Sequence, residues 1–208
     1  MKSFGSFAAV MLLSVVNSAC QPVLPTTRVH GLVYCAEGSP ESFNPQLVTS
    51  GTTIDAISQH LYDRLLDIDP DTGELIPGLA QSWKISADGL TYRFQLRQGV
   101  AFHQTAYFSP SRTLNSEDVL FTFARLLSVQ HPFHQTATEY PYFDSVEWQQ
   151  LVAKLTVLGP DEIEFTLTKP DSSFLSTLAT DFAAILSAEY GEQLISNNTL
   201  EDLDQLPI

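Results

Sequence analysis

Basic residues are scarce in this chain of 208 residues. Ten lysines and arginines stand against 24 aspartates and glutamates, which gives a formal net charge of −14 at pH 7. Binding to nucleic acid depends on clustered Lys and Arg that displace counterions from phosphates, so this balance argues against a nucleic-acid partner. High solubility is the simplest explanation of the acidity, and attraction of cationic peptides is the alternative.

Cysteines are also few, with Cys20 and Cys35 the two in the sequence. Two cysteines cannot define a disulfide scaffold, and no C-x-x-C spacing indicates a metal or redox centre. In an oxidising compartment the two could pair with each other, or Cys35 could await a partner farther along a longer chain. The cysteines therefore bear on the compartment and not on an activity.

Long hydrophobic runs are missing beyond the N-terminus. Lys2 precedes an apolar run over residues 4–16, and small residues at 17–20 offer a cleavage site, which is typical of an export signal over residues 1–19. The run is shorter than the roughly 20 residues that a spanning helix needs. We therefore expect a soluble, monomeric mature protein in the periplasm that starts with a flexible lead-in over residues 20–31.

Cys20 leaves a second fate open for the N-terminus, in which lipid is attached to its thiol after cleavage. A lipoprotein signal usually carries an apolar residue three positions earlier, where this chain has Asn17. Plain secretion is therefore the expectation, and a lipid anchor through Cys20 is the alternative.

Motifs that carry catalysis are absent as well. The sequence contains no Gly-x-Ser-x-Gly elbow, no His-Glu-x-x-His pair, no phosphate-binding glycine loop and no dinucleotide fingerprint. His131 and His134 flank a proline and lack a specified third ligand, which favours a solvated turn over a metal site. His103 is expected to be packed or hydrogen-bonded. We predict a protein that is not an enzyme and needs no cofactor or metal.

Strand and helix patterns alternate along the rest of the chain, which predicts a mixed α/β fold with prominent antiparallel hairpins. In the first half we expect a strand over 32–35 and then a helix capped by Thr52 or Thr53, with a buried stripe at Ile54, Ile57, Leu61 and Leu65. A turn at 69–73 and a hairpin over 82–97 that turns at Asp88-Gly89 follow. In the second half we expect a helix from Asn115 to Leu127 with Asp118 in a capping box, a hairpin over 155–167, a helix capped by Asp171 or Ser172, and a helix from Ser187 to Leu194. Residues 197–205 are polar and acidic and have no later element to pack upon.

Aromatic residues crowd the middle of the chain. They are Tyr107, Phe108, Phe133, Tyr140, Tyr142, Phe143 and Trp148. Such a cluster could line a groove, but core packing is the favoured role for any one of them.

Several short segments occur in a fixed order over residues 32–208. They are residues 32–41, 43–46, 49–53, 61–65, 78–83, 88–103 with its Tyr92-x-Phe94-x-Leu96-Arg97-x-Gly99-Val100 pattern, and 114–119. Together they resemble the peptide-binding branch of the bacterial ABC-transporter solute-binding proteins, extracellular solute-binding family 5. Residues 102–112 and 141–145 look more like Sap-type members, which are linked to antimicrobial-peptide resistance, so the choice between dipeptide-type and Sap-type stays open.

This resemblance implies a class II-like periplasmic binding protein, with two lobes joined at a hinge and a subdomain inserted near the N-terminus. It also implies a peptide ligand held between the lobes and delivered to an inner-membrane ABC permease. The stretch Thr49, Ser50, Gly51, Thr52 and Thr53 matches a ligand-facing element, and we name these five as candidate ligand-binding residues. Gly51 lets a ligand approach the backbone, and the hydroxyls and a helix start supply donors for a carboxylate. An ordinary helix cap is the alternative.

The resemblance also bears on the end of the chain. Family members continue past Pro207-Ile208, and the acid and arginine that grip the peptide termini, like the cysteine that pairs with Cys35, come from the later lobe. Residues 32–208 are therefore expected to be the N-terminal part of a binding protein without its second lobe, impaired in peptide binding. Haem, nickel or oligosaccharide binding by the same fold, and a non-functional fragment, are the alternatives.

Overall fold

The computed structural model describes residues 33–58, 60–137 and 139–208. The chain divides into two compact units, residues 1–33 and 34–208, and the second is described below. The predicted signal peptide over residues 1–19, the lead-in over residues 20–31 and Cys20 lie outside the described residues, so they stay predictions. Among the helices that are described, none is long and apolar enough to cross a membrane.

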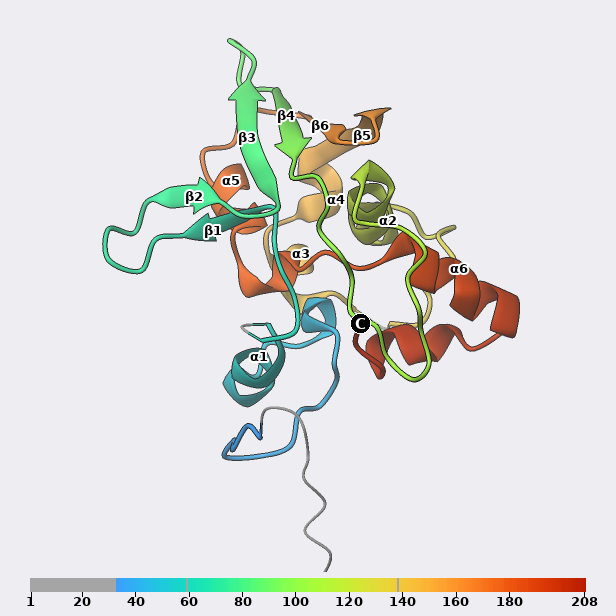
Figure 1. Cartoon of the computed structure of the whole chain (residues 1–208). Helices are drawn as coiled ribbons and strands as arrows, with labels where there is room; N and C mark the ends of the chain where they lie inside the picture. Colours follow the sequence, from blue (N-terminus) through green and yellow to red (C-terminus); the bar gives the residue numbers. More distant parts are fainter. Residues whose placement is uncertain (1–32, 59, 138) are drawn as a thin grey trace, which may run out of the picture. The chain divides into compact units, whose positions relative to one another are not determined.

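A four-stranded antiparallel sheet with the strand order β3-β4-β6-β5 forms the frame of this unit (Figure 1). One hairpin consists of β3 (Ala80–Ile85) and β4 (Thr91–Leu96), and the other of β5 (Val152–Gly159) and β6 (Glu162–Leu167). Gly89 has a φ of 70° in the first turn, which a residue without a Cβ adopts at little cost. Both predicted hairpins are confirmed, and the pairing of β4 with β6 joins them into one sheet.

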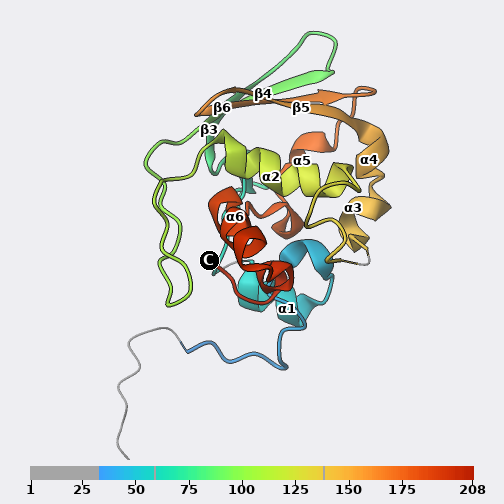
Figure 2. The ribbon, with the colours of Figure 1, turned by 90° about the vertical axis from the view of Figure 1, so that its right-hand side faces the viewer.

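One face of the sheet is apolar and packs on helices. Its buried side chains are Tyr92, Phe94, Leu96, Ile163, Phe165 and Leu167. Three helices lie on this side, α2 (Ser116–Leu127), α4 (Trp148–Leu151) and α5 (Phe174–Leu178), and Figure 2 shows α2 and α5 beneath the strands. The strict alternation along β4 thus separates a buried face from a wet face, as the sequence predicts.

The start of α2 is fixed by the predicted capping box. The Asn115 side chain accepts a hydrogen bond from the Glu117 N–H, and the Asp118 carboxylate accepts from the Asn115 N–H at 2.9 Å. Asp118 also accepts from the Ala188 N–H at 2.8 Å, at the first residue of α6 (Ala188–Asn197). One buried carboxylate therefore holds the N-termini of two helices together.

The α2 and α6 helices also approach each other closely where Gly191 faces Phe121. A Cβ added at Gly191 of α6 would lie 2.6 Å from the Phe121 ring of α2, so the glycine permits the contact. The predicted cap of α6 is confirmed, because the Ser187 side chain accepts from the Tyr190 N–H at 3.1 Å.

The remaining elements are short. β1 (Leu66–Ile68) and β2 (Leu75–Pro77) form a two-stranded sheet, and the chain reverses between them through the predicted turn at residues 69–73. The other elements are η1 (Pro45–Leu47), α1 (Gly51–Ile57), α3 (Pro141–Ser145), η2 (Asp181–Ala183) and η3 (Leu200–Asp204). A mixed α/β fold with prominent hairpins is therefore confirmed for the described part of the chain.

Some local predictions are wrong. Residues 33–35 form no strand, and Tyr34 is 46% exposed, because no described strand pairs with this segment. The helix predicted to continue through Leu61 and Leu65 ends at Ile57, and Leu65 is buried instead beside the start of β3, where its carbonyl accepts from the Ala80 N–H. Neither threonine caps α1, since its N-cap is Ser50.

Two further predictions fail in the second half of the described chain. α5 starts after Ser173, and Asp171 accepts from the Ser173 N–H at 2.7 Å without capping the helix itself. Residues 197–205, predicted to be polar with nothing to pack upon, include η3, in which Leu203 is 3% and Asp204 is 5% exposed. The tail packs on earlier segments of the chain, which the local pattern could not reveal.

Candidate functional site

The loop from Thr49 to Thr53 leads directly into α1. Ser50 occupies the N-cap position and makes no side-chain capping bond, so its hydroxyl is not committed to the helix. Thr49 and Gly51 are exposed, and Ser50 and Thr52 are half-buried. Three hydroxyls and the first free N–H groups of a helix therefore gather on one short exposed stretch.

Gly51 shows how much room this stretch leaves. A Cβ added there would meet no atom within 4 Å, and its φ lies outside the positive region that favours glycine. Neither packing nor backbone conformation thus requires a glycine at this position. A ligand could approach the backbone here closely, as the sequence argument proposes.

Thr53 differs from the other four candidates. Its side chain is fully buried, and its Oγ1 accepts a hydrogen bond from the Glu41 N–H at 3.0 Å. The structure therefore brings Thr49, Ser50, Gly51 and Thr52 together at the surface and turns Thr53 inward, where it ties the loop to the segment around residue 41.

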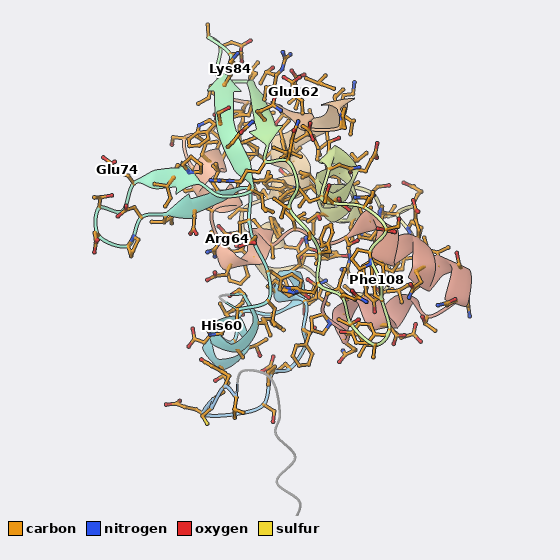
Figure 3. All side chains as sticks on the ribbon, viewed as in Figure 1. His60, Arg64, Glu74, Lys84, Phe108 and Glu162 are labelled. Atoms are coloured by element: carbon orange, nitrogen blue, oxygen red, sulfur yellow. The ribbon has the colours of Figure 1, made fainter. Side chains whose placement is uncertain are left out.

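A hollow of about 480 Å³ lies beside the loop. It is lined by Tyr34, Cys35, Ala36, Glu37, Gly51, Thr52 and Asp55. The Tyr34 ring contacts His60 at a centroid distance of 5.0 Å, and Figure 3 shows His60 near the end of α1. The lining combines a threonine hydroxyl with the carboxylates of Glu37 and Asp55. Hydroxyl and backbone groups can bind a peptide main chain, and carboxylates can bind an ammonium group.

The segment before the loop is held by buried polar groups. Asn44 caps η1 by accepting from the Gln46 N–H at 3.0 Å, and the Gln46 amide donates to the Thr122 carbonyl of α2 at 3.4 Å. The Tyr62 hydroxyl donates to the Phe43 carbonyl at 2.7 Å. Burial raises the pKa of Tyr62, and the charge of Asp204 raises it further, so the phenol stays a donor at neutral pH.

Sequence reasoning missed an ion pair beneath this segment. Arg125 of α2 is completely buried, and its Nη2 lies 3.0 Å from a carboxylate oxygen of Asp204. Its Nε donates to the Phe133 carbonyl and the Tyr140 hydroxyl, each at 2.8 Å. A lone arginine among the buried positions of α2 was the one available signal, and its partner lies far away in the sequence.

The aromatic stretch belongs mainly to the core, as favoured. Phe108, Phe133, Tyr140, Phe143 and Trp148 are buried. Tyr107 is exposed and Tyr142 is half-buried. Figure 3 shows Phe108 beside the C-terminal helical segments, where its ring lies 5.0 Å from that of Tyr190. The contacts of Tyr107 and Phe108 with Tyr190 hold the long connection after β4 against α6.

The predictions for the histidines are confirmed for the turn at residues 131–134 and are wrong for His103. Residues 131–134 form the predicted turn, closed by the His134 N–H donating to the His131 carbonyl at 2.9 Å. Burial and the charge of Arg125 lower the pKa of His131 to about 4. His103 is exposed rather than packed, which corrects the expectation. Over the described residues, no group of three or more His, Cys, Asp and Glu is arranged to hold a metal.

Comparison with known proteins links this geometry to a family. The model of the bacterial extracellular solute-binding proteins, family 5 (middle), matches residues 74–207, more than half of the chain. The chain is 46% identical over 182 residues to the peptide transport periplasmic protein SapA of Salmonella typhimurium, which covers 87% of this chain and 33% of that protein. It is 44% identical over 199 residues to the dipeptide-binding protein of Escherichia coli, and this match covers 95% of this chain and 37% of that protein.

Solved structures agree. The dipeptide-binding protein of Pseudoalteromonas sp. SM9913, in complex with Met-Leu, matches with a TM-score of 0.82 and 51% identity over 85% of this chain and 35% of that one. DppA of Helicobacter pylori, in complex with the peptide STSA, matches with a TM-score of 0.76 and 37% identity. This match covers 83% of this chain and 33% of that one. The chain spans about a third of the length of these relatives. The predicted periplasmic-binding-protein fold is confirmed, and the chain belongs to the bacterial extracellular solute-binding proteins of family 5.

Proposed function

We propose that this chain supplies part of the peptide-binding site of an ABC-transporter substrate-binding protein. The observation that carries the proposal is the likeness to the Pseudoalteromonas protein, whose structure contains the dipeptide Met-Leu. The two chains are 51% identical. In this proposal the protein works in the periplasm, captures a dipeptide or short oligopeptide and passes it to an inner-membrane ABC permease. It acts as a monomer, without catalysis and without a nucleic-acid partner.

The ligand-facing residues of the proposal are Thr49, Ser50, Gly51 and Thr52, with Thr53 as their support. An extended peptide exposes main-chain N–H and C=O groups and one charge at each end. The loop offers hydroxyls and free N–H groups to such a chain, and Glu37 and Asp55 border the adjacent hollow. Relatives are about three times longer, so we expect the remaining contacts to come from beyond the matched third.

Nickel is a weaker candidate ligand. NikZ of Campylobacter jejuni, solved with Ni(L-His), matches at 23% identity and a TM-score of 0.56, which establishes a common fold alone. The two peptide complexes match at 51% and 37% identity. Peptide is therefore the ligand class that the comparisons favour, and the choice between dipeptide-type and Sap-type preference stays open because both kinds of relative match at similar identity.

Replacing Gly51 with valine tests the ligand role of the loop. The added side chain meets no protein atom nearby, so the fold is expected to stay intact, while a peptide approaching the backbone is blocked. We expect peptide affinity to fall about tenfold or more, the equivalent of one or more lost hydrogen bonds, in a titration of the labelled chain followed by NMR.

Gly159→Val is the matched control. Gly159 also has no atom within 4 Å of an added Cβ, and it lies at the end of β5 in the sheet. This variant should bind peptide as the unaltered chain does. Equal affinities for all three proteins would remove the loop from the ligand site.

A further inference from the structure

Asp204 lies in the last helical element of the chain and contacts the segment that precedes the ligand loop. Its carbonyl accepts from the Phe43 N–H at 2.9 Å and from the Ser42 hydroxyl at 2.8 Å. Its carboxylate accepts from the side-chain amide of Asn44 at 2.8 Å. Three consecutive residues are thus fixed by one residue that lies about 160 positions away.

The other side of the Asp204 carboxylate faces α2 and the turn after it. Arg125 contacts it at 3.0 Å, and the Thr136 hydroxyl donates to it at 3.2 Å. Arg125 is itself fixed by bonds to the Phe133 carbonyl and the Tyr140 hydroxyl. The carboxylate is therefore anchored to the helical body by charge-assisted bonds, which are stronger than neutral ones.

One hydrogen bond connects the segment that Asp204 holds, residues 42–44, to the ligand loop through the neighbouring residue Glu41. The N–H of Glu41, next to Ser42, donates to the buried Oγ1 of Thr53 at 3.0 Å. Asn44 also caps η1, which ends two residues before Thr49. The loop is thus attached at both of its ends. Thr53 bonds to Glu41, the neighbour of Ser42, and η1, which Asn44 caps, precedes Thr49. Asp204 holds both Ser42 and Asn44.

We infer that Asp204 is a positioning residue for the ligand loop: it transmits the position of α2 through residues 41–44 to Thr53 and so sets the place of residues 49–53. The inference rests on the proposed function only for the claim that this loop touches peptide. Asp204 itself touches no ligand in this scheme.

Hydrogen exchange of the whole chain tests the relay. In Asp204→Asn the shape is retained and the charge that binds Arg125 is lost, so amides at residues 41–58 should exchange about tenfold or more faster, while the β4 and β6 amides change far less. Thr53→Val is a second, near-isosteric variant that cuts the last link alone. It should speed exchange in α1 and leave the amides of residues 42–46 protected.

Asp118→Asn is the matched control, because Asp118 is also buried and paired with an arginine, Arg112, at 2.6 Å. Its effect should fall on the starts of α2 and α6 and not on residues 41–58. The inference is overturned if Asp204→Asn leaves the loop amides unchanged or if Asp118→Asn speeds them equally.

Peptide titration separates this inference from the proposed function. Faster loop exchange in Asp204→Asn with a matching loss of peptide affinity supports both. Faster exchange with unchanged affinity upholds the relay and contradicts the ligand role of the loop. Unchanged exchange in Asp204→Asn, with affinity lost in Gly51→Val, upholds the ligand role and overturns the relay.

Discussion

Replacing Arg125 with methionine is expected to lower the free energy of unfolding by about 3–5 kcal/mol, because it leaves the carboxylate of Asp204 buried without its cation. Asp204 is 5% exposed, so water cannot solvate the charge in the folded state. The Phe133 carbonyl and the Tyr140 hydroxyl lose a donor in the same step. Urea unfolding followed by circular dichroism measures the loss.

The double variant Arg125→Met, Asp204→Leu distinguishes a stranded charge from lost packing. It should cost about 0.5–3 kcal/mol less than the sum of the two single variants, because neither charge then remains buried alone. Arg93→Met is the control, since Arg93 pairs with Glu164 at 2.8 Å with its side chain 49% exposed, and about 1 kcal/mol or less should be lost. Additive losses for Arg125 and Asp204 would show that the two residues are not coupled.

Replacing Phe165 with alanine is expected to cost about 3–5 kcal/mol, the range for emptying a large aromatic site in a core. Phe165 lies on the buried face of β6 with no exposed surface, and its ring contacts those of Phe94, Phe123 and Phe174 at centroid distances of 5.3–5.7 Å. Rings from the sheet, from α2 and from α5 thus meet at one side chain, and its removal weakens the contact between these layers.

Ile85→Ala provides the comparison for Phe165→Ala. Ile85 is in the same sheet, at the end of β3, but is 48% exposed, so its truncation should change stability by about 0.5 kcal/mol or less. Both variants can be followed by urea unfolding, with the fluorescence of the two tryptophans, Trp83 of β3 and buried Trp148, as a second probe. A loss for Phe165→Ala no larger than that for Ile85→Ala would contradict a core centred on this ring.

The parts of the fold that sequence predicted are those fixed by neighbours in the chain. Asp88-Gly89 turns the first hairpin because a single glycine reaches the positive φ, and Asn115 with Asp118 starts α2 through bonds three residues apart. The caps of α1 and α5 were misplaced by only one to three residues, whereas the larger failures involve segments that are distant in the sequence. Residues 33–35 of the predicted strand have no described strand to pair with. The helix after residue 51 ends at Ile57, and Leu65 bonds to Ala80 at the start of β3 instead.

For the candidate site, the sequence named a surface stretch of the chain but not the contacts that hold this stretch in place. The resemblance singled out residues 49–53, and four of these five residues lie at the surface in one stretch. That Thr53 points inward depends on the Glu41 N–H, and that Asp204 is buried depends on Arg125. An acidic residue in a polar tail gives no local sign of a partner nearly 80 positions away.

The central claim is that residues 49–52 touch a peptide, and a titration of the isotopically labelled chain with the dipeptide Met-Leu tests it most directly. The account predicts that amide signals of Thr49, Ser50, Gly51 and Thr52 shift most, with a dissociation constant of about 1 mM or weaker because further contacts are expected from beyond the matched third. Shifts confined to other surfaces, or the absence of any shift at these four amides at saturating peptide, would contradict it.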